Sequence, residues 1–252
     1  MIDEPFAYGD TVIHRIDPRY RIAAATALSI AIAVAYRFQA LLLALLVAVL
    51  LVLAARLDLK KVGSRLWVIA GFLVLIWIVL PVTYSGDSLF TIGPLDISYQ
   101  GIELSAQITL KSIAILFVLI ALTTTMSIAT MGHALDHLKV PGKIVHLLLI
   151  SYRYVFVIEQ EYKRIVRAAK IRGFSPGTNL HTYRTVAYML GMLFVRAALR
   201  ADRVYQAMLL RGFHGRFYCL SQFPAHRRNR FFAIITTCLL AGFCFLEWGP
   251  GK

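Results

Sequence analysis

The chain has 252 residues, 59% of them hydrophobic and only 16% charged, with a mean hydropathy of +0.69. These values exclude an ordinary soluble domain. The net charge of +14 could suggest a nucleic-acid partner, but residues 131–230 hold 17 Lys and Arg against 4 Asp and Glu, a balance of 17 − 4 = +13. A basic segment beside apolar runs is typical of the cytoplasmic part of a membrane protein, so no nucleic-acid partner is expected.

Apolar runs predict five membrane-spanning helices. The 34 residues from 22 to 55 would form one helix of about 51 Å, which exceeds the hydrocarbon core of about 30 Å. They are therefore interpreted as a hairpin of two spans, 22–36 and 40–55. After a polar stretch, a third span is expected over 66–82, a fourth over 102–128 and a fifth over 231–248.

Charge sets the expected topology. The segments before the first and third spans are basic, whereas 84–101 is expected to be an acidic loop that carries Asp87 and Asp96 and no Lys or Arg. By the positive-inside rule the N-terminus is cytoplasmic, 84–101 is external, and the fourth span returns to the cytoplasm. The predicted protein is an all-α integral membrane protein. Its parts are 1–130 with the N-terminal tail and four spans, a cytoplasmic insert 131–230, and 231–252 with the fifth span.

The insert is expected to contain two long amphipathic helices that lie on or under the membrane. The first extends from about residue 142 toward "SPGTN" at 175–179, and the second runs from about His181 to Leu210. Two sets of side chains at helical spacing support this. The first helix is predicted to have an apolar face formed by Val155, Ile158, Tyr162, Ile165 and Ala169. The second is predicted to have a basic stripe formed by Arg196, Arg200 and Arg203.

Each of these helices ends in the same pattern, R-x-x-x-A-x-x-x-R-G-F, and the two copies begin 39 residues apart at Arg164 and Arg203. A glycine just past the last turn is a common helix cap, and arginine there suits the helix dipole. A cap needs only the glycine, however, and a spacing of four places each Arg-Ala-Arg trio on one helix face. The repeat therefore predicts two matched docking surfaces for a partner with two equivalent, carboxylate-bearing pockets. The residues concerned are Arg164, Ala168, Arg172 and Gly173 in the first copy, and Arg203, Ala207, Arg211 and Gly212 in the second.

The segment "HALDH", which holds His133, Asp136 and His137, offers an alternative function, metal binding, to the docking role of the two helix ends. Histidines four residues apart on a helix could bind a metal, and a membrane-embedded metalloenzyme is the remote hypothesis. No third ligand stands at a firm spacing, so a polar hinge is the preferred interpretation. The sequence has no G-x-x-x-x-G-K-[ST] motif and no C-x-x-C pair. It is therefore not expected to bind ATP or a metal, or to be an enzyme.

These features resemble the T component, or EcfT family, of energy-coupling-factor transporters, most sharply over 140–217. That family has two cytoplasmic helices ending in x-R-G, here "IRG" and "LRG", although Ile171 and Leu210 replace its usual Ala. "SYRYVFV" (151–157), "YRT" (183–185) and 200–217 are similar to the CbiQ branch, which is associated with cobalt and nickel uptake. Phe156, where many T components have Pro, also fits that branch.

The resemblance implies a non-catalytic scaffold of an ATP-driven cobalt importer in the bacterial cytoplasmic membrane, in contact with its lipids. Two ATP-binding cassette subunits, CbiO-like, would contact Arg172 and Arg211, with Gly173 and Gly212 allowing close approach. A separate CbiM-like membrane subunit would capture the substrate, and a small CbiN-like subunit could accompany it. Nickel or a vitamin is the alternative substrate, because another subunit selects it.

Overall fold

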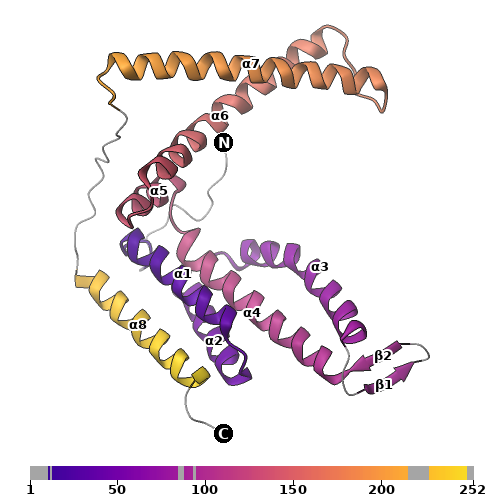
Figure 1. The fold of residues 1–252 in the computed structure, drawn as a ribbon, viewed down its shortest axis with the longest axis vertical. Coiled ribbons are helices and arrows are strands. Elements are labelled where there is room, and N and C mark those ends of the chain that lie inside the picture. The colour runs from indigo at the N-terminus through magenta and orange to yellow at the C-terminus, as the bar shows by residue number, and fades with distance from the viewer. Residues whose placement is uncertain (1–10, 12, 85–87, 93–94, 215–226, 249–252) are drawn as a thin grey trace. The chain divides into compact units, whose positions relative to one another are not determined.

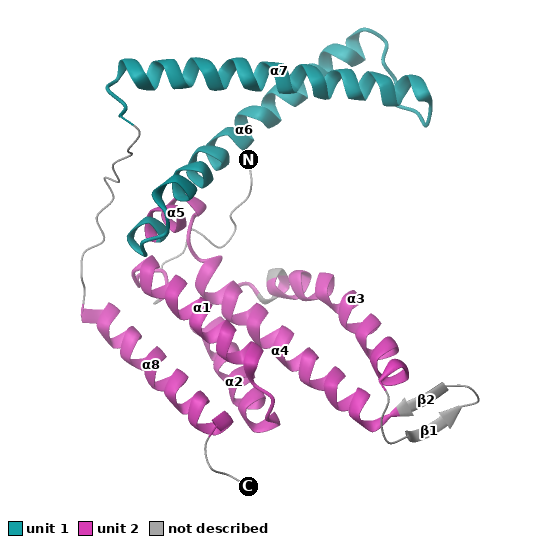
Figure 2. Ribbon diagram, viewed as in Figure 1, with its two compact units in different colours: residues 1–3, 135–222 teal, residues 4–134, 223–252 magenta. Residues whose placement is uncertain are grey.

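The computed structural model describes residues 11, 13–84, 88–92, 95–214 and 227–248 (Figure 1). Within these ranges the chain forms eight helices and two short strands. It divides into two compact units, one of residues 1–3 and 135–222 and the other of residues 4–134 and 223–252 (Figure 2). The predicted helical membrane protein is confirmed, with a small strand pair added.

The larger unit begins with the predicted helical hairpin. Helix α1 spans Pro18–Val34 and α2 spans Phe38–Ala54, 17 residues each. Asp17 caps α1 by accepting a hydrogen bond from the backbone N–H of Arg19 (3.0 Å), and Pro18 occupies the first turn, where no amide is needed. At about 1.5 Å per residue each helix is roughly 26 Å long, somewhat shorter than a hydrocarbon core of about 30 Å.

Three further helices are long and apolar enough to cross a membrane, over Val62–Thr83, Tyr99–Thr123 and Arg227–Trp248 of the described residues. They belong to α3 (Leu59–Thr83), α4 (Tyr99–Thr123) and α8 (Arg227–Trp248). The third, fourth and fifth predicted spans are thus confirmed as helices. Two boundaries were wrong: α3 already begins within the expected polar stretch, and α4 ends five residues before Ile128.

Consecutive threonines account for the early end of α4. The hydroxyls of Thr123, Thr124 and Thr125 each donate to the carbonyl four residues earlier, a competing bond that bends helices. A separate short helix, α5 (Ile128–His137), follows. Ser127 caps it, since its Oγ accepts from the backbone N–H of Thr130 (3.2 Å).

The predicted external loop contains structure that was not expected. Strands β1 (Ser88–Ile92) and β2 (Leu95–Ser98) pair antiparallel, with Thr91 opposite Asp96. Asp87 lies outside the described residues. Just after β2, a Cβ on Gly101 would lie 2.7 Å from the Cα of Pro81, so only glycine lets α3 and α4 approach this closely.

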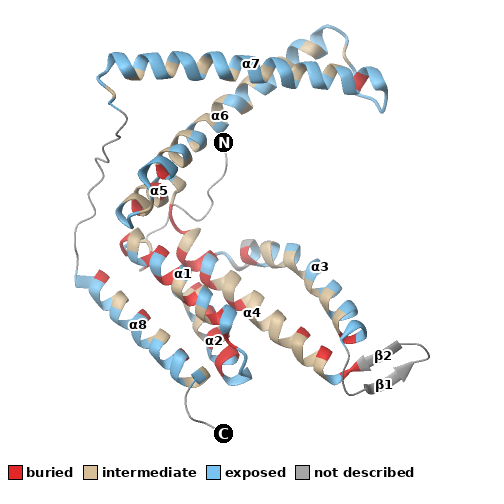
Figure 3. Cartoon of the chain, in the orientation of Figure 1, coloured by how far each residue is buried: buried red, intermediate tan, exposed pale blue. Residues whose placement is uncertain are grey.

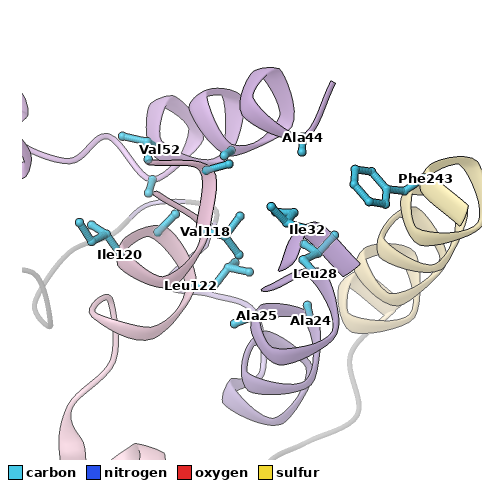
Figure 4. Close-up of a cluster of buried hydrophobic side chains, with 14 of the residues drawn as sticks. Ala24, Ala25, Leu28, Ile32, Ala44, Val52, Val118, Ile120, Leu122 and Phe243 are labelled. Carbon is cyan, nitrogen blue, oxygen red and sulfur yellow. The ribbon is translucent and has the colours of Figure 1, made fainter. Parts of the chain in front are cut away.

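Small side chains form the core of this unit (Figure 4). The buried face of α2 places Ala40, Ala44, Ala48 and Val52 four residues apart along the helix. Helix α4 contacts α1, α2 and α3. In membrane proteins such small residues let helix backbones approach and gain dispersion contacts. The remaining core side chains labelled in the close-up are Ala24, Ala25, Leu28 and Ile32 of α1, Val118, Ile120 and Leu122 of α4, and Phe243 of α8.

Among the residues whose burial is described, Arg21 is the charged side chain that is most fully buried. Arg21 is 1% exposed and donates from Nε to the carbonyl of Leu122 (3.3 Å), from Nη1 to that of Ile13 (2.9 Å), and from Nη2 to Oγ1 of Thr125 (3.0 Å). The guanidinium therefore helps to satisfy a carbonyl in the last turn of α4, to which Oγ1 of Thr125 also donates (3.5 Å).

Helix α3 differs from α4 because many of its large apolar side chains are exposed (Figure 3). Trp67, Val68 and Phe72 are among the most exposed side chains. In a helix long enough to cross a membrane, such a surface suits contact with lipid or with another membrane subunit.

Candidate functional site

The smaller unit consists mainly of two crossing helices, α6 (Gly142–Ile171) and α7 (Leu180–Leu210) (Figure 1). Both predicted insert helices are confirmed almost to the residue. In the break between them, the backbone N–H of Gly177 donates to Oγ1 of Thr182 (3.2 Å). The site expected from the sequence lies at the C-terminal ends of these two helices.

The end of α6 is a Schellman cap. The backbone N–H of Phe174 donates to the carbonyl of Ala169 (3.1 Å), and that of Gly173 donates to Lys170 (3.0 Å). Gly173 has φ of +83°, the left-handed conformation that this cap requires. Arg172 is therefore the last residue before the chain reverses its twist, and its side chain is exposed.

The end of α7 repeats this geometry. Phe213 N–H donates to Met208 (3.1 Å), Gly212 N–H donates to Leu209 (3.0 Å), and φ of Gly212 is +78°. Arg211 takes the position of Arg172 and is likewise exposed. The R-G-F repeat thus encodes one cap twice: the arginine ends the helix, the glycine turns left-handed, and the phenylalanine closes the second hydrogen bond.

An ion pair marks the crossing of the two helices. The guanidinium of Arg196 on α7 bonds to Oε1 of Glu161 on α6, and Nη1 of Arg164 lies 3.5 Å from Oε2 of the same carboxylate. The bond from Arg196 lowers the pKa of Glu161, and Arg164 and Arg200 add to this effect, while desolvation opposes it. Part of the predicted basic stripe on α7 therefore turns toward α6.

On either side of the crossing the helices diverge and leave a groove. The first groove, of about 450 Å³, is mostly apolar and lies beside the earlier half of α6 and the later half of α7. The second, of about 790 Å³, lies beside the later half of α6 and the earlier half of α7. Phe213 and Met208 line the first groove, and Phe174 and Ala169 line the second, so the closing phenylalanine of each cap faces a groove.

The two Arg-Ala-Arg trios have different surroundings. Arg164, Ala168 and Arg172 all line the second groove. Arg203, Ala207 and Arg211 are exposed and line neither groove. What the two copies share is therefore the cap, with its exposed arginine and its glycine.

Little of this helix pair is buried. Val145 is the buried residue of α6 and Thr182 that of α7. On the predicted apolar face, Ile165 and Ala169 line the second groove and Ile158 lines the first. Three members of this face are exposed, namely Val155, Ile158 and Tyr162. Extended exposed apolar surface of this kind marks a site that lipid or protein partners cover.

The alternative site on α5 gains no further ligand. His133, Asp136 and His137 all belong to that helix. Among the described residues, no three His, Cys, Asp or Glu side chains are grouped so that they could hold a metal ion.

Sequence reasoning missed two features of the site, the Glu161–Arg196 pair and the role of the phenylalanines. The pair joins residues 35 positions apart on two helices, and no local pattern signals it. The phenylalanines could have been recognised, because an apolar residue directly after the capping glycine is part of a Schellman cap.

A family model and several curated relatives match most of the chain. The family model CbiQ, described as "Cobalt transport protein", matches residues 9–219. Three relatives are each named energy-coupling factor transporter transmembrane protein EcfT. The protein of Thermosediminibacter oceani is 26% identical over 82% of both chains, and that of Listeria innocua is 28% identical over 85% of both. That of Acidaminococcus fermentans is 26% identical over 96% of this chain and 94% of its own.

Proposed function

Because the chain belongs to the CbiQ family, the transmembrane T components of energy-coupling-factor transporters, we propose that Arg172 and Arg211 link it to two ATP-hydrolysing subunits of a cobalt importer. A T component is a non-catalytic, multi-pass membrane subunit that works with ATPases and a substrate-binding subunit. The observation that carries the proposal is the repeated cap, which presents an exposed arginine at the end of each crossing helix.

The cap suits docking for a physical reason. A Schellman cap satisfies two carbonyls of the last turn within the chain, so the helix end can enter a protein pocket with fewer unpaired backbone groups. Glycine leaves open space around the turn, since a Cβ on Gly173 or Gly212 would meet nothing within 4 Å. The arginine beside it can bind a carboxylate in a bidentate manner.

The supporting residues differ between the two ends. Arg164 and Ala168 would contact the ATP-hydrolysing subunit from within the second groove. Arg203 and Ala207 would contact it from an open helix face. A partner that contacts both ends therefore has to recognise the cap itself. Two homologous ATP-binding cassette subunits, CbiO-like, satisfy that requirement.

The exposed apolar surface of α3 supports a proposal for the other partners. Helix α3 would contact lipid or a CbiM-like substrate-binding subunit, with which a small CbiN-like subunit could assemble. Residues 131–230 would form the cytoplasmic insert, and the N-terminus would be cytoplasmic in a bacterial inner membrane. The chain itself would bind no cofactor, because its partners use the ATP.

Cobalt is the proposed substrate. The description of the family model and the segment 151–157, with Phe156, support a transition metal. Uptake of radioactive cobalt, with nickel and vitamins as competitors, tests this in cells that contain the whole transporter. Uptake of nickel or a vitamin, with no cobalt uptake, would reassign the substrate and leave the coupling role intact.

Charge reversal tests the coupling role. Arg172→Glu or Arg211→Glu places a carboxylate where a cation is needed, and loss of a buried charged partner costs about 2–5 kcal/mol. We call the capped end of each helix a tip, residues 171–174 on α6 and 210–213 on α7. Each variant is expected to lose substrate uptake and coupled ATP hydrolysis, even where the other tip keeps the complex assembled. Arg167→Glu is the matched control, since Arg167 is exposed on α6 and its Nε bonds to the carbonyl of Lys163 in the same helix. Near-normal uptake by both tip variants would refute the coupling role.

A further inference from the structure

The residue before each capping arginine has a large aliphatic side chain that is almost fully exposed. Ile171 is 87% exposed and Leu210 is 90% exposed, the two highest values for large apolar residues in the part of the chain that the structure describes. A single exposed leucine on a protein surface needs no explanation. Two at the same position of the same cap, each beside an exposed arginine, are a repeated arrangement.

Helix geometry explains why both side chains point away from their own helix pair. In each cap the phenylalanine and the residue five before it, Ala169 or Met208, line a groove between α6 and α7. Ile171 and Leu210 each follow that groove-lining residue by two positions, which is about 200° around the helix. The phenylalanine thus faces inward and the aliphatic residue faces outward at both tips.

Resting on the coupling role above, we propose that Ile171 and Leu210 are apolar anchors that enter matching sockets on the two ATP-binding subunits. Each socket combines an aliphatic depression for the anchor with a carboxylate at its rim for the adjacent arginine. The arginine contributes direction and charge recognition, and the anchor contributes buried apolar area.

A protein socket explains the arrangement better than a lipid surface does. Lipid binding requires a broad apolar face and places no constraint on the direction of one side chain. Here the cap fixes the backbone, and so the directions of the Cα–Cβ bonds, of one aliphatic residue and one arginine at the ends of two different helices. Two copies of a shaped pocket can bind only side chains that leave the backbone in the same direction at both helix ends, as they do here.

The test uses the full-length chain in proteoliposomes, titrated with the purified ATP-binding subunits of the same transporter. Ile171→Ala and Leu210→Ala should each weaken association about tenfold, and the double variant more, since each removes most of one buried aliphatic side chain. Ile171→Val and Leu210→Met should restore most of the affinity. Leu199→Ala is the matched control, because Leu199 is 52% exposed on α7 but lies away from both tips. The variants remove exposed side chains, so the thermal stability of the chain should stay unchanged.

The outcomes separate this inference from the coupling role. If the alanine variants bind the ATP-binding subunits as tightly as the original chain, while Arg172→Glu with Arg211→Glu does not, the anchors are refuted and the coupling role stands. If the charge reversals also bind normally, both ideas fail. If the alanine variants bind the ATP-binding subunits normally and only make a fluorophore beside the tips less accessible to a lipid-borne quencher in the proteoliposomes, the tips bind membrane and the socket is refuted.

Discussion

Replacement of the capping glycines by alanine tests whether the two helix ends adopt the geometry described above. Gly173 and Gly212 have φ of +83° and +78°, where a Cβ costs about 1–2 kcal/mol. Steric crowding adds nothing, because both positions are open to 4 Å. The whole penalty of Gly173→Ala or Gly212→Ala is therefore conformational, and it should open the cap about 5- to 30-fold more often.

Hydrogen exchange measures this opening directly. The amide of Phe213 bonds to Met208 and that of Gly212 bonds to Leu209, so their exchange should accelerate by this factor in Gly212→Ala. Coupled ATP hydrolysis should fall in parallel if the cap presents the arginine. Asparagine tolerates the left-handed region, so Gly212→Asn should show a smaller effect.

A third glycine supplies a control, because its replacement by alanine should stabilise the helix instead of destabilising it. Gly191 lies within α7 and has no positive φ, and a Cβ at this position would meet nothing within 4 Å. Gly191→Ala should stabilise the helix by about 1 kcal/mol and leave both caps intact. Unchanged exchange at the tips in Gly173→Ala and Gly212→Ala would show that these glycines do not hold the left-handed conformation, and would refute the matched caps.

Two further predictions concern the crossing and the topology. Since Arg196 lowers the pKa of Glu161, the contribution of this pair to helix crossing should be constant from neutral pH down to the ordinary carboxyl pKa of about 4.3. It should be lost only as pH falls through the lowered value. Distances between spin labels on α6 and α7 would report it, and a change between pH 7 and 5 would contradict the assignment. In a background without native cysteines, an impermeant thiol reagent added to intact cells should reach Tyr99→Cys and not Gly177→Cys. Labelling at 177 would place the helix pair outside the cell.

The sequence predicted the helix pair well and its contacts poorly. The bounds of α6 and α7 followed from helical periodicity and from "SPGTN", which are local signals. The cap followed from the glycine, whose left-handed preference is also local. The Glu161–Arg196 pair and the burial of Arg21 depend on residues distant in sequence, and no local sequence pattern predicts either contact.

Two local signals were present but not used. Three consecutive threonines precede the end of α4, and their hydroxyls compete for helix carbonyls. The alternation in "FTI" (90–92) and "LDIS" (95–98), separated by Gly93 and Pro94 in the sequence, is typical of a strand pair and was interpreted as a loop. At the threonines, the long apolar run favoured a continuous helix. At the strands, the polar residues favoured a loop.

The arrangement of the helix pair suggests how a small rotation could be transmitted. Arg172 follows Glu161 by eleven residues and Arg211 follows Arg196 by fifteen, so the two tips lie about 17 Å and 23 Å along their helices from the crossing. Since the helices diverge into open grooves on either side, few side chains would have to separate for one helix to turn against the other. A turn of about 10° would move the tips by about 3–4 Å at these lengths. Rigid caps would pass that displacement to whatever binds them, whereas a frayed helix end would absorb it. In such a turn the glycines would keep the tips rigid, and the ion pair between Glu161 and Arg196 would fix the point about which they move.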